Sequence, residues 1–175
     1  LLVSDAFIRE SGILDKITKV LDSSGITWSA FTDTVPDPTT AAVANGVGAL
    51  KNGHFDCLIA VGGGSPMDTA KAMAVLGTHG GTMRDCKVPN QIDHCDYPII
   101  AIPTTAGTGS EVTRFTVITD TDTDEKMLCM GLAYVPQAAL VDYTLTMSMP
   151  WRLTADTGID TLTHAIEAYV SKKHN

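Results

Sequence analysis

The chain contains 175 residues with a formal net charge of −8, enough for one full α/β domain and a short further segment. Its hydrophobic content of 44% and charged content of 18% are ordinary for a globular protein. The acidic balance excludes nucleic acid and acidic membrane surfaces as partners, because both require basic patches, and no apolar run reaches the length of a membrane span.

The four cysteines show no sign of a disulfide framework. Cys57, Cys86, Cys95 and Cys129 form no C-x-x-C pair, and Cys57 lies in a strand-like run where we expect it to pack as a small hydrophobic residue. This usage is typical of a reducing compartment, so we expect a cytoplasmic protein.

The first third of the chain alternates between strand and helix patterns. The run Leu1-Leu2-Val3 is strand-like from its first residue, which suggests a truncated N-terminus. Apolar residues at helical spacing predict a helix over 8–21, and an alternating stretch predicts a strand over 26–31. Thr39 or Thr40 then caps a helix that ends near Gly53.

The remaining patterns continue this alternation. They predict, in order, a strand over 57–61, a helix from Pro66 to about Leu76, a long loop over 77–97, a buried strand over 97–102, a hairpin of residues 115–119 and 127–130, a strand over 138–141 and a helix over 153–170. This order indicates an α/β fold with a Rossmann-like, mostly parallel sheet covered by helices on both faces. We expect residues 1–147 to form an α/β dinucleotide-binding domain and residues 148–175 to begin an all-helical domain, because the pattern changes near Pro150.

Three consecutive glycines, Gly62 to Gly64, join the second buried strand to its helix. We expect Ser65 to be the helix N-cap, Pro66 the first helical residue and Asp68 the third position of a capping box. Such a turn lets backbone approach a ligand, and the helix start offers N–H groups to a phosphate. A plain strand-to-helix connection is the alternative. Three glycines exceed what a connection needs, so the phosphate interpretation is favoured.

A second turn of small residues, 103–110, follows the next buried strand. It and its neighbourhood carry several hydroxyls: Thr104, Thr105, Thr108, Ser110 and Thr113. Ligands of open parallel sheets bind at the carboxyl ends of the strands, where this turn, the glycine turn and Asp5 would face one crevice. Hydroxyls and N–H groups suit the phosphates and riboses of a dinucleotide. A threonine-rich surface loop is the alternative, which Gly107 and Gly109 disfavour because they imply close backbone approach.

Two acidic residues are candidates for holding a ribose. Asp85 lies about 20 residues beyond the glycines, where a standard Rossmann domain places its acid, but in loop-like sequence. Asp5 ends a strand, where a carboxylate would accept ribose hydroxyls and repel a 2′-phosphate. Capping the following helix is an equal alternative for Asp5.

Asp160 and His164 lie four residues apart in the predicted last helix, with Glu167 on the same face. Such a pair supplies two ligands to a divalent metal, although spacing alone favours a solvated polar face. The other histidines show no partner spacing and are expected at the surface: His54, His79, His94 and His174.

Three long motifs, in register across nearly the whole chain, carry a family resemblance. They are Gly62-Gly63-Gly64-Ser65-Pro66-Met67-Asp68, Pro103-Thr104-Thr105-Ala106-Gly107-Thr108-Gly109-Ser110-Glu111-Val112-Thr113 and Gly158-Ile159-Asp160-Thr161-Leu162-Thr163-His164-Ala165-Ile166-Glu167-Ala168-Tyr169. Together they resemble the iron-dependent (group III) alcohol dehydrogenases. The resemblance implies hydride transfer between a small alcohol and its aldehyde or ketone, with NAD (NADP as the alternative) and a divalent metal, Fe2+ or alternatively Zn2+. A homo-oligomer is left open.

The resemblance also implies roles for individual residues. Asp5 matches the acid that selects NAD, Asp37 a position near the adenosine where the family often has Asn, and Asp68 the acid near the nicotinamide. Gly63, Gly64 and Ser65 match the diphosphate turn, and Lys126 matches a lysine near the ribose. The cofactor-contacting threonines correspond to Thr104, Thr105, Thr108 and Thr113, and the first two metal ligands to Asp160 and His164.

The chain departs from the family pattern at both ends. Two further metal histidines would lie beyond Asn175, as would a general acid or base, and a first strand pair would precede Leu1. We therefore expect an incomplete fragment that holds metal poorly. A nucleotide-binding module without catalysis is the alternative, and a dehydroquinate-synthase-type lyase a less favoured one, because the 104–110 run and the 165–169 helix match the dehydrogenases.

Overall fold

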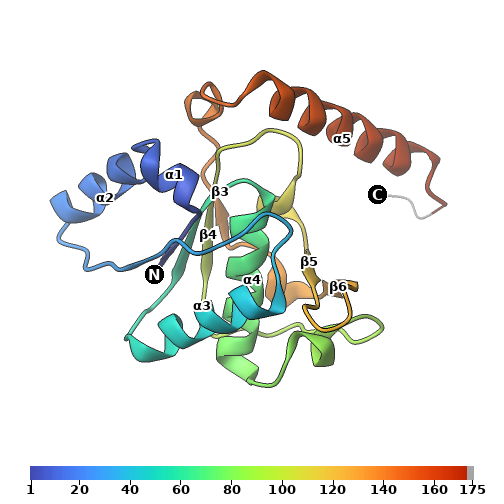
Figure 1. Cartoon of the computed structure of the whole chain (residues 1–175), viewed down its shortest axis with the longest axis horizontal. Helices are drawn as coiled ribbons and strands as arrows, with labels where there is room; N and C mark the ends of the chain where they lie inside the picture. The colour runs from blue at the N-terminus through green and yellow to red at the C-terminus, as the bar shows by residue number, and fades with distance from the viewer. Residues whose placement is uncertain (173–175) are drawn as a thin grey trace.

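The computed structural model describes residues 1–172 and has a five-stranded parallel sheet at its centre (Figure 1). The strand order is β2-β1-β3-β4-β7. The strands are β1 (Leu2–Val3), β2 (Ala30–Phe31), β3 (Leu58–Gly62), β4 (Ile99–Pro103) and β7 (Ala138–Ala139). The predicted mostly parallel sheet is confirmed.

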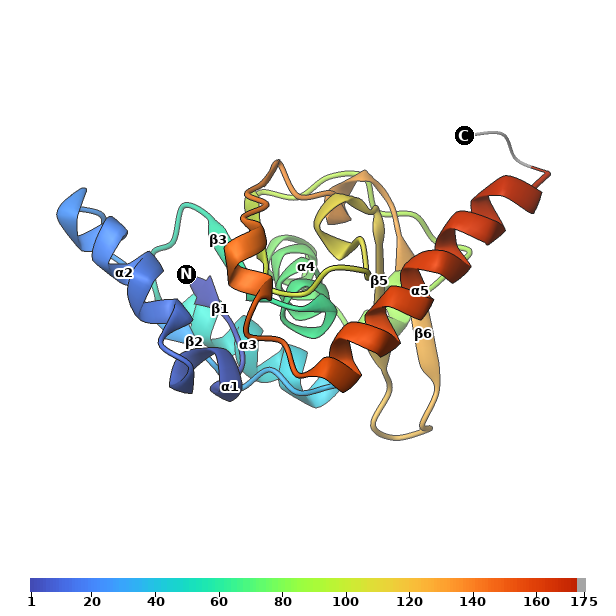
Figure 2. The same ribbon diagram turned by 90° about the horizontal axis from the view of Figure 1, so that it is seen from above.

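Helices cover both faces of this sheet, as predicted. They are α1 (Ala6–Glu10) and α2 (Ile13–Ser23) on one face, and α3 (Thr40–Asn52) and α4 (Gly64–His79) on the other (Figures 1 and 2). Alternate strand residues point to opposite faces. Leu58 and Ala60 of β3 therefore pack with α3 and α4, whereas Val61 packs with α1 and α2. A strand buried on both sides needs an apolar run, which is what residues 58–61 provide.

The chain direction brings the ends of β1 and β3 together. From β1 it passes through α1 and α2 to β2, and it then returns by α3 on the other face to β3, on the far side of β1. The carboxyl ends of the neighbouring strands β1 and β3 therefore form a topological switch point, where open α/β sheets bind ligands. Ser4 Oγ donates to the carbonyl of Val61 at 2.8 Å, and the N–H of Thr104 donates to the carbonyl of Gly62 at 2.9 Å. Three strand ends are therefore tied into one edge.

A separate antiparallel hairpin packs against α4. It consists of β5 (Phe115–Thr119) and β6 (Lys126–Met130), as predicted, and buries Ile118 and Met127 against Val75 of α4. Arg84 and Lys87, in and after the 3₁₀ helix η1 (Met83–Cys86), form ion pairs with Asp120 and Glu125 at the hairpin turn. These contacts hold the hairpin in place without joining it to the main sheet.

The last described helix, α5 (Trp151–Val170), lies along one side of the molecule and is largely exposed (Figure 2). Thr157 is its buried residue. The turn before it contains the 3₁₀ helix η4 (Tyr143–Thr146). In the described part of the chain, no helix has the length and apolar character needed to cross a membrane.

Several predicted boundaries are wrong. The helix over 8–21 is two helices, because Gly12 adopts φ 77° and breaks the chain between them. The strands over 26–31 and 138–141 shrink to two residues each, β2 and β7, which pair with a neighbour on one side only. Cys57 precedes β3 and is partly exposed rather than packed within a strand.

The helix predicted from Pro66 to Leu76 is longer at both ends. It begins at Gly64 with Gly63 as its N-cap and runs to His79, so the predicted loop over 77–97 starts too early and also contains η1. Ser65 is therefore a first-turn residue and not the N-cap, and Asp68 forms no capping box. Its carboxylate is engaged elsewhere, as described below.

Candidate functional site

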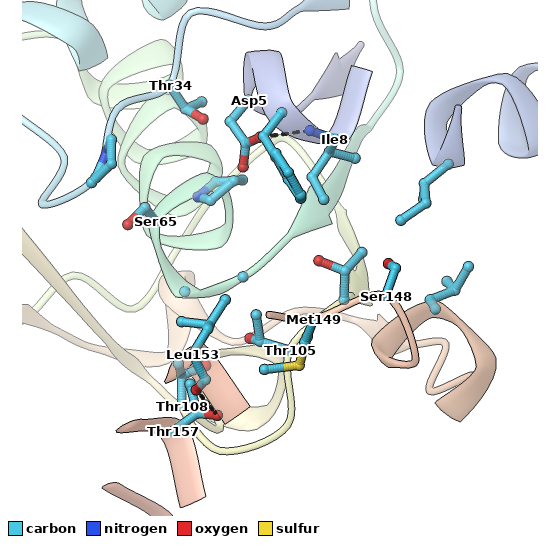
Figure 3. Close-up of a pocket in the computed structure, with 18 of the residues that line it drawn as sticks. Asp5, Ile8, Thr34, Ser65, Thr105, Thr108, Ser148, Met149, Leu153 and Thr157 are labelled. Carbon is cyan, nitrogen blue, oxygen red and sulfur yellow. Dashed lines mark hydrogen bonds between the residues drawn. The ribbon is translucent and has the colours of Figure 1, made fainter. Parts of the chain in front are cut away.

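Two adjoining cavities open at the carboxyl edge of the sheet. The larger has a volume of about 490 Å³ and the smaller about 350 Å³, and both are lined by Gly64, Ser65 and Thr108. The start of α4 therefore lies between them. Figure 3 shows the larger cavity, with Asp5 and Ser65 on one side and Thr105, Thr108 and Thr157 on the other.

The glycine turn between β3 and α4 packs tightly against the threonine loop, residues 104–110. A Cβ atom on Gly63 would lie 3.1 Å from Thr105 Cγ2, and one on Gly64 would lie 3.3 Å from Thr108 Cγ2. Gly62 has φ 144°, a conformation that side chains disfavour. The turn is thus a backbone cradle at a helix N-terminus, whose first N–H groups have no acceptors within the helix.

The threonine loop offers a buried hydroxyl to this cradle. Thr105 Oγ1 is buried and has no hydrogen-bond partner within residues 1–172. Buried polar groups are nearly always paired, so an unpaired one beside a cavity indicates a missing partner. At Gly107 a Cβ atom would overlap the backbone of Thr157, which confirms the expected close approach. At Gly109 there is room for a Cβ atom, because the nearest atom, Thr113 Cγ2, would lie 3.9 Å away. A glycine is favoured there by the backbone, which adopts φ 65°.

Asp5 caps α1, as one of the two interpretations expected, and it also lies at the larger cavity. Its Oδ1 accepts a hydrogen bond from the N–H of Ile8 at 2.8 Å and so caps α1, while the residue also lines the larger cavity (Figure 3). Its Oδ2 lies 3.5 Å from the Cβ position of Gly62. The rival acid, Asp85, is exposed and forms a capping box with Thr82 in η1, and it lines neither cavity.

The smaller cavity gathers other predicted residues. Asp37, Asp68, Thr113 and His164 line it. Asp37 adopts φ 50°, a conformation that Asp and Asn tolerate better than most residues. Lys126 lines neither cavity, but its Nζ pairs with Asp37 Oδ1 at 2.8 Å, which places it at the rim.

Asp68 fastens α4 to the segment that leads into the hairpin. Its Oδ1 accepts from Ser110 Oγ at 2.6 Å and its Oδ2 from the N–H of Val117 at 3.0 Å. Thr116 Oγ1 donates to its backbone carbonyl at 3.0 Å. Burial raises the pKa of this carboxyl, and these hydrogen bonds oppose the rise.

Lys71 is a buried cation that the sequence interpretation missed. Its side chain is fully buried, and its Nζ donates to the carbonyl of Thr113 at 3.0 Å, to Thr113 Oγ1 at 3.2 Å and to the carbonyl of Phe115 at 2.9 Å. Burial lowers the pKa of Lys71 to about 8, although Asp68 and Glu111 counteract this. The available signal was a lysine inside the apolar run 70–76, three residues after Asp68.

Asp160 and His164 lie one turn apart on α5, with Oδ1 and Nε2 separated by 3.6 Å. Their side chains are 46% and 53% exposed, and His164 lines the smaller cavity. Within residues 1–172, no cluster of three or more His, Cys, Asp or Glu side chains suited to a metal ion occurs. A catalytic metal site usually has three protein ligands, so this pair fits part of a site.

The remaining histidines lie at the surface where described. His54, His79 and His94 are exposed, as predicted, and His79 and His94 contact each other edge to face at 6.2 Å between ring centroids. His174 falls outside the described residues.

Comparisons with known proteins identify the family of the chain. The family model of iron-containing alcohol dehydrogenases matches residues 1–143. Among curated proteins, the chain is similar to lactaldehyde reductase of Escherichia coli K12 (39% identity over 174 residues) and NAD-dependent methanol dehydrogenase of Bacillus methanolicus (40% over 172 residues). These alignments cover 98% of this chain but 46% and 45% of the relatives, so the chain spans about half their length.

Solved structures give the same result. A crystal structure of 1,3-propanediol oxidoreductase superimposes with a TM-score of 0.93 and 37% identity, over 99% of this chain and 46% of that one. Sulfoacetaldehyde reductase of Bifidobacterium kashiwanohense, solved in complex with NAD+, gives a TM-score of 0.90 with 36% identity, over the same shares of the two chains. The observed fold is therefore the fold of the matching half of these enzymes.

Proposed function

The chain belongs to the iron-containing alcohol dehydrogenase family, and on that premise we propose that it binds NAD at the two cavities as part of an enzyme that interconverts a small alcohol and its aldehyde or ketone. The observation that carries the proposal is the cradle formed by Gly63 and Gly64 against the threonine loop. It lies at the switch point of the sheet and contains the unpaired hydroxyl of Thr105.

The cradle fits a diphosphate in shape and in chemistry. Glycines leave room for phosphate oxygens, and the α4 N-terminus supplies N–H groups and the positive end of its dipole. The apolar lining of the larger cavity, which includes Phe7, Val35 and Met149, suits a base. Asp5 would accept ribose hydroxyls there and oppose the phosphate of NADP, which supports NAD as the cofactor.

We assign the cofactor residues on this basis. The proposed contacts are Asp5, Asp37, Gly63, Gly64, Ser65, Asp68, Thr104, Thr105, Thr108, Thr113 and Lys126. Of these, Asp68 acts through its hold on Ser110 and Val117, since both of its oxygens already accept hydrogen bonds. Lys126 acts at the rim through Asp37.

The metal is proposed at Asp160 and His164. A bound Fe2+, or alternatively Zn2+, supplies Lewis-acid polarisation of the substrate oxygen. Two ligands in the described part of the chain fit a portion of such a centre. His164, which lies at the edge of the smaller cavity, is therefore assigned as a ligand that would hold the metal there. The cofactor supplies the hydride chemistry, and the residues of this chain position it and exclude water.

The proposed substrate class is supported by the names of relatives, which include lactaldehyde reductase and NAD-dependent methanol dehydrogenase. We assign the protein to the cytoplasm because its four cysteines are all free, although Cys57 and Cys95 are partly exposed. A homo-oligomer is the assembly we would test first by light scattering. The second candidate function is a cofactor-binding module without turnover. It is favoured by the observation that, within residues 1–172, Asp160 and His164 supply two metal ligands where a catalytic site usually has three.

Cofactor titration of the purified chain tests the proposal. NADH binding, followed by calorimetry, should be saturable, and Thr105→Val should weaken it about 3- to 10-fold because a buried hydroxyl loses its ligand partner. Thr18→Val is the matched control, since that buried hydroxyl bonds within α2. A folded chain that does not bind NADH would contradict the proposal. Alcohol-dependent reduction of NAD+ after loading with Fe2+ supports the dehydrogenase, whereas binding without turnover supports the module.

A further inference from the structure

Lys71 is a buried ammonium group whose hydrogen bonds all run to one short segment beside the smaller cavity. Its exposure is 0%, and its three contacts at 2.9–3.2 Å are with Thr113 and Phe115. Lysine is rarely buried completely, and packing between α4 and the hairpin would be served by an apolar side chain of similar length. Packing alone therefore does not explain why this buried position holds a charged side chain.

The chemistry of the ammonium group fixes the state of the Thr113 hydroxyl. An ammonium group donates three hydrogen bonds and accepts none, so Thr113 Oγ1 must be the acceptor in its contact with Lys71. The proton of that hydroxyl is then left to point elsewhere. No group among residues 1–172 accepts this proton, and Thr113 lines the smaller cavity. Because Thr113 is partly exposed at the cavity, this proton is available to solvent or to an acceptor bound there.

We propose that Lys71 is a positioning residue of the cofactor site, which holds Thr113 in place and makes its hydroxyl a hydrogen-bond donor to an oxygen acceptor of the bound dinucleotide. The proposal rests on the proposed cofactor function. Asp68 holds the same segment from both ends, through Ser110 and Val117, so the backbone around Thr113 is fixed independently of Lys71. The contribution of Lys71 is to set the direction in which the Thr113 hydroxyl donates its proton.

This arrangement is sensitive to pH. A neutral amine carries a lone pair and accepts the proton of Thr113 Oγ1, which would reverse that hydrogen bond and remove the donor from the cavity. The charged groups that face Lys71 are Asp68 of α4 and Glu111 of η2 (Ser110–Val112), and β5 contains no ionisable side chain. Because burial lowers the pKa of Lys71 to about 8, the loss falls within an accessible pH range.

A double-mutant cycle tests the proposal on the full chain, with the dissociation constant for NADH as the readout. Thr113→Val removes the donor and should weaken binding about 3- to 10-fold, and Lys71→Met should weaken it by a similar factor. The double variant should bind no more weakly than Thr113→Val, because both changes remove one interaction. Thr78→Val, which alters a hydroxyl at the far end of α4, is the control and should leave binding unchanged.

The pH profile separates positioning from a purely structural role. Wild-type affinity should fall as pH rises through about 8, whereas Thr113→Val should show a flat profile over that range. This comparison retains Lys71, so it decides the matter even where Lys71→Met does not fold. The role of Lys71 would be overturned by additive losses in the double variant, or by equal pH profiles in wild type and Thr113→Val. In either case, NADH binding by the wild type would leave the proposed function standing. A wild-type chain that does not bind NADH would overturn both.

Discussion

Asp5 Oδ1 accepts a hydrogen bond from the backbone N–H of Ile8 at 2.8 Å, so one carboxylate both begins α1 and faces the larger cavity. This double role affects how its charge is tested. Asp5→Asn preserves the size and the capping oxygen and removes the charge, because Asn and Asp are equally good N-caps.

We expect Asp5→Asn to reduce the preference for NADH over NADPH by about 5- to 10-fold, since opposition between a carboxylate and a phosphate amounts to roughly 1 kcal/mol. Asp5→Gly should have the same effect at a small cost in stability. Dissociation constants for both cofactors provide the measurement. Unchanged discrimination in both variants would remove Asp5 from cofactor selection.

A second prediction concerns the cradle. Gly64→Val should weaken NADH binding at least tenfold, because a side chain there enters the space between α4 and Thr108, where the Cβ alone comes within 3.3 Å of Thr108 Cγ2. Gly48→Ala in α3 is the matched control: its Cβ would meet no atom within 4 Å, and it should raise the free energy of unfolding by roughly 0.5–1 kcal/mol. Calorimetry and urea denaturation measure the two effects. Undiminished NADH affinity in folded Gly64→Val would place the diphosphate elsewhere.

Lys71 also predicts how stability depends on pH. Its pKa is lowered from 10.5 to about 8 by burial, so between these values the unfolded chain binds a proton that the folded chain has lost. The free energy of unfolding should therefore rise with pH over that interval, by on the order of 1–3 kcal/mol, relative to Lys71→Met. Urea denaturation of both proteins at pH 7, 8, 9 and 10 gives the difference. Parallel pH dependences would show that Lys71 titrates normally.

The metal pair gives the fourth prediction. The chain should bind Fe2+ or Zn2+ weakly, because residues 1–172 contain no cluster that adds a third ligand to Asp160 and His164. His164→Ala should abolish this binding, whereas His54→Ala, at an exposed site outside both cavities, should not change it. Titration calorimetry and elemental analysis test this. Tight stoichiometric metal that survives His164→Ala would reject the pair as ligands.

The parts of this site that the sequence predicted are those set by local chemistry. An apolar run followed by Gly62 to Gly64 predicts a strand, a turn and a helix because all of the determinants are neighbours in the chain. The carboxyl-edge crevice followed from the parallel sheet, and the structure ties it together through Ser4 and Thr104. At the turn itself the helix start was misplaced, since Gly63 supplies the N-cap position that Ser65 was expected to fill.

The parts that the sequence did not predict depend on distant partners. Asp68 was assigned to a capping box, yet its carboxylate bonds Ser110 and Val117, more than forty residues away. In the sequence, Lys71 is one polar residue in an apolar helix. Its acceptors, the carbonyls of Thr113 and Phe115, are more than forty residues away, so the sequence does not indicate its role. Edge strands were overestimated for a similar reason, because pairing length depends on the neighbouring strand.

The hairpin of β5 and β6 is a sheet of its own, so the β5 wall of the smaller cavity is not a strand of the main sheet. Backbone ladders hold strands about 4.8 Å apart whatever the sequence. No such ladder joins α4 to β5, which are held together by side-chain hydrogen bonds of Asp68, Lys71 and Thr116 and by apolar packing. Single substitutions can therefore change the spacing between α4 and β5 without breaking a strand pairing. Divergence along this wall can thus change which ligands the cavity accommodates while both sheets keep their hydrogen bonds.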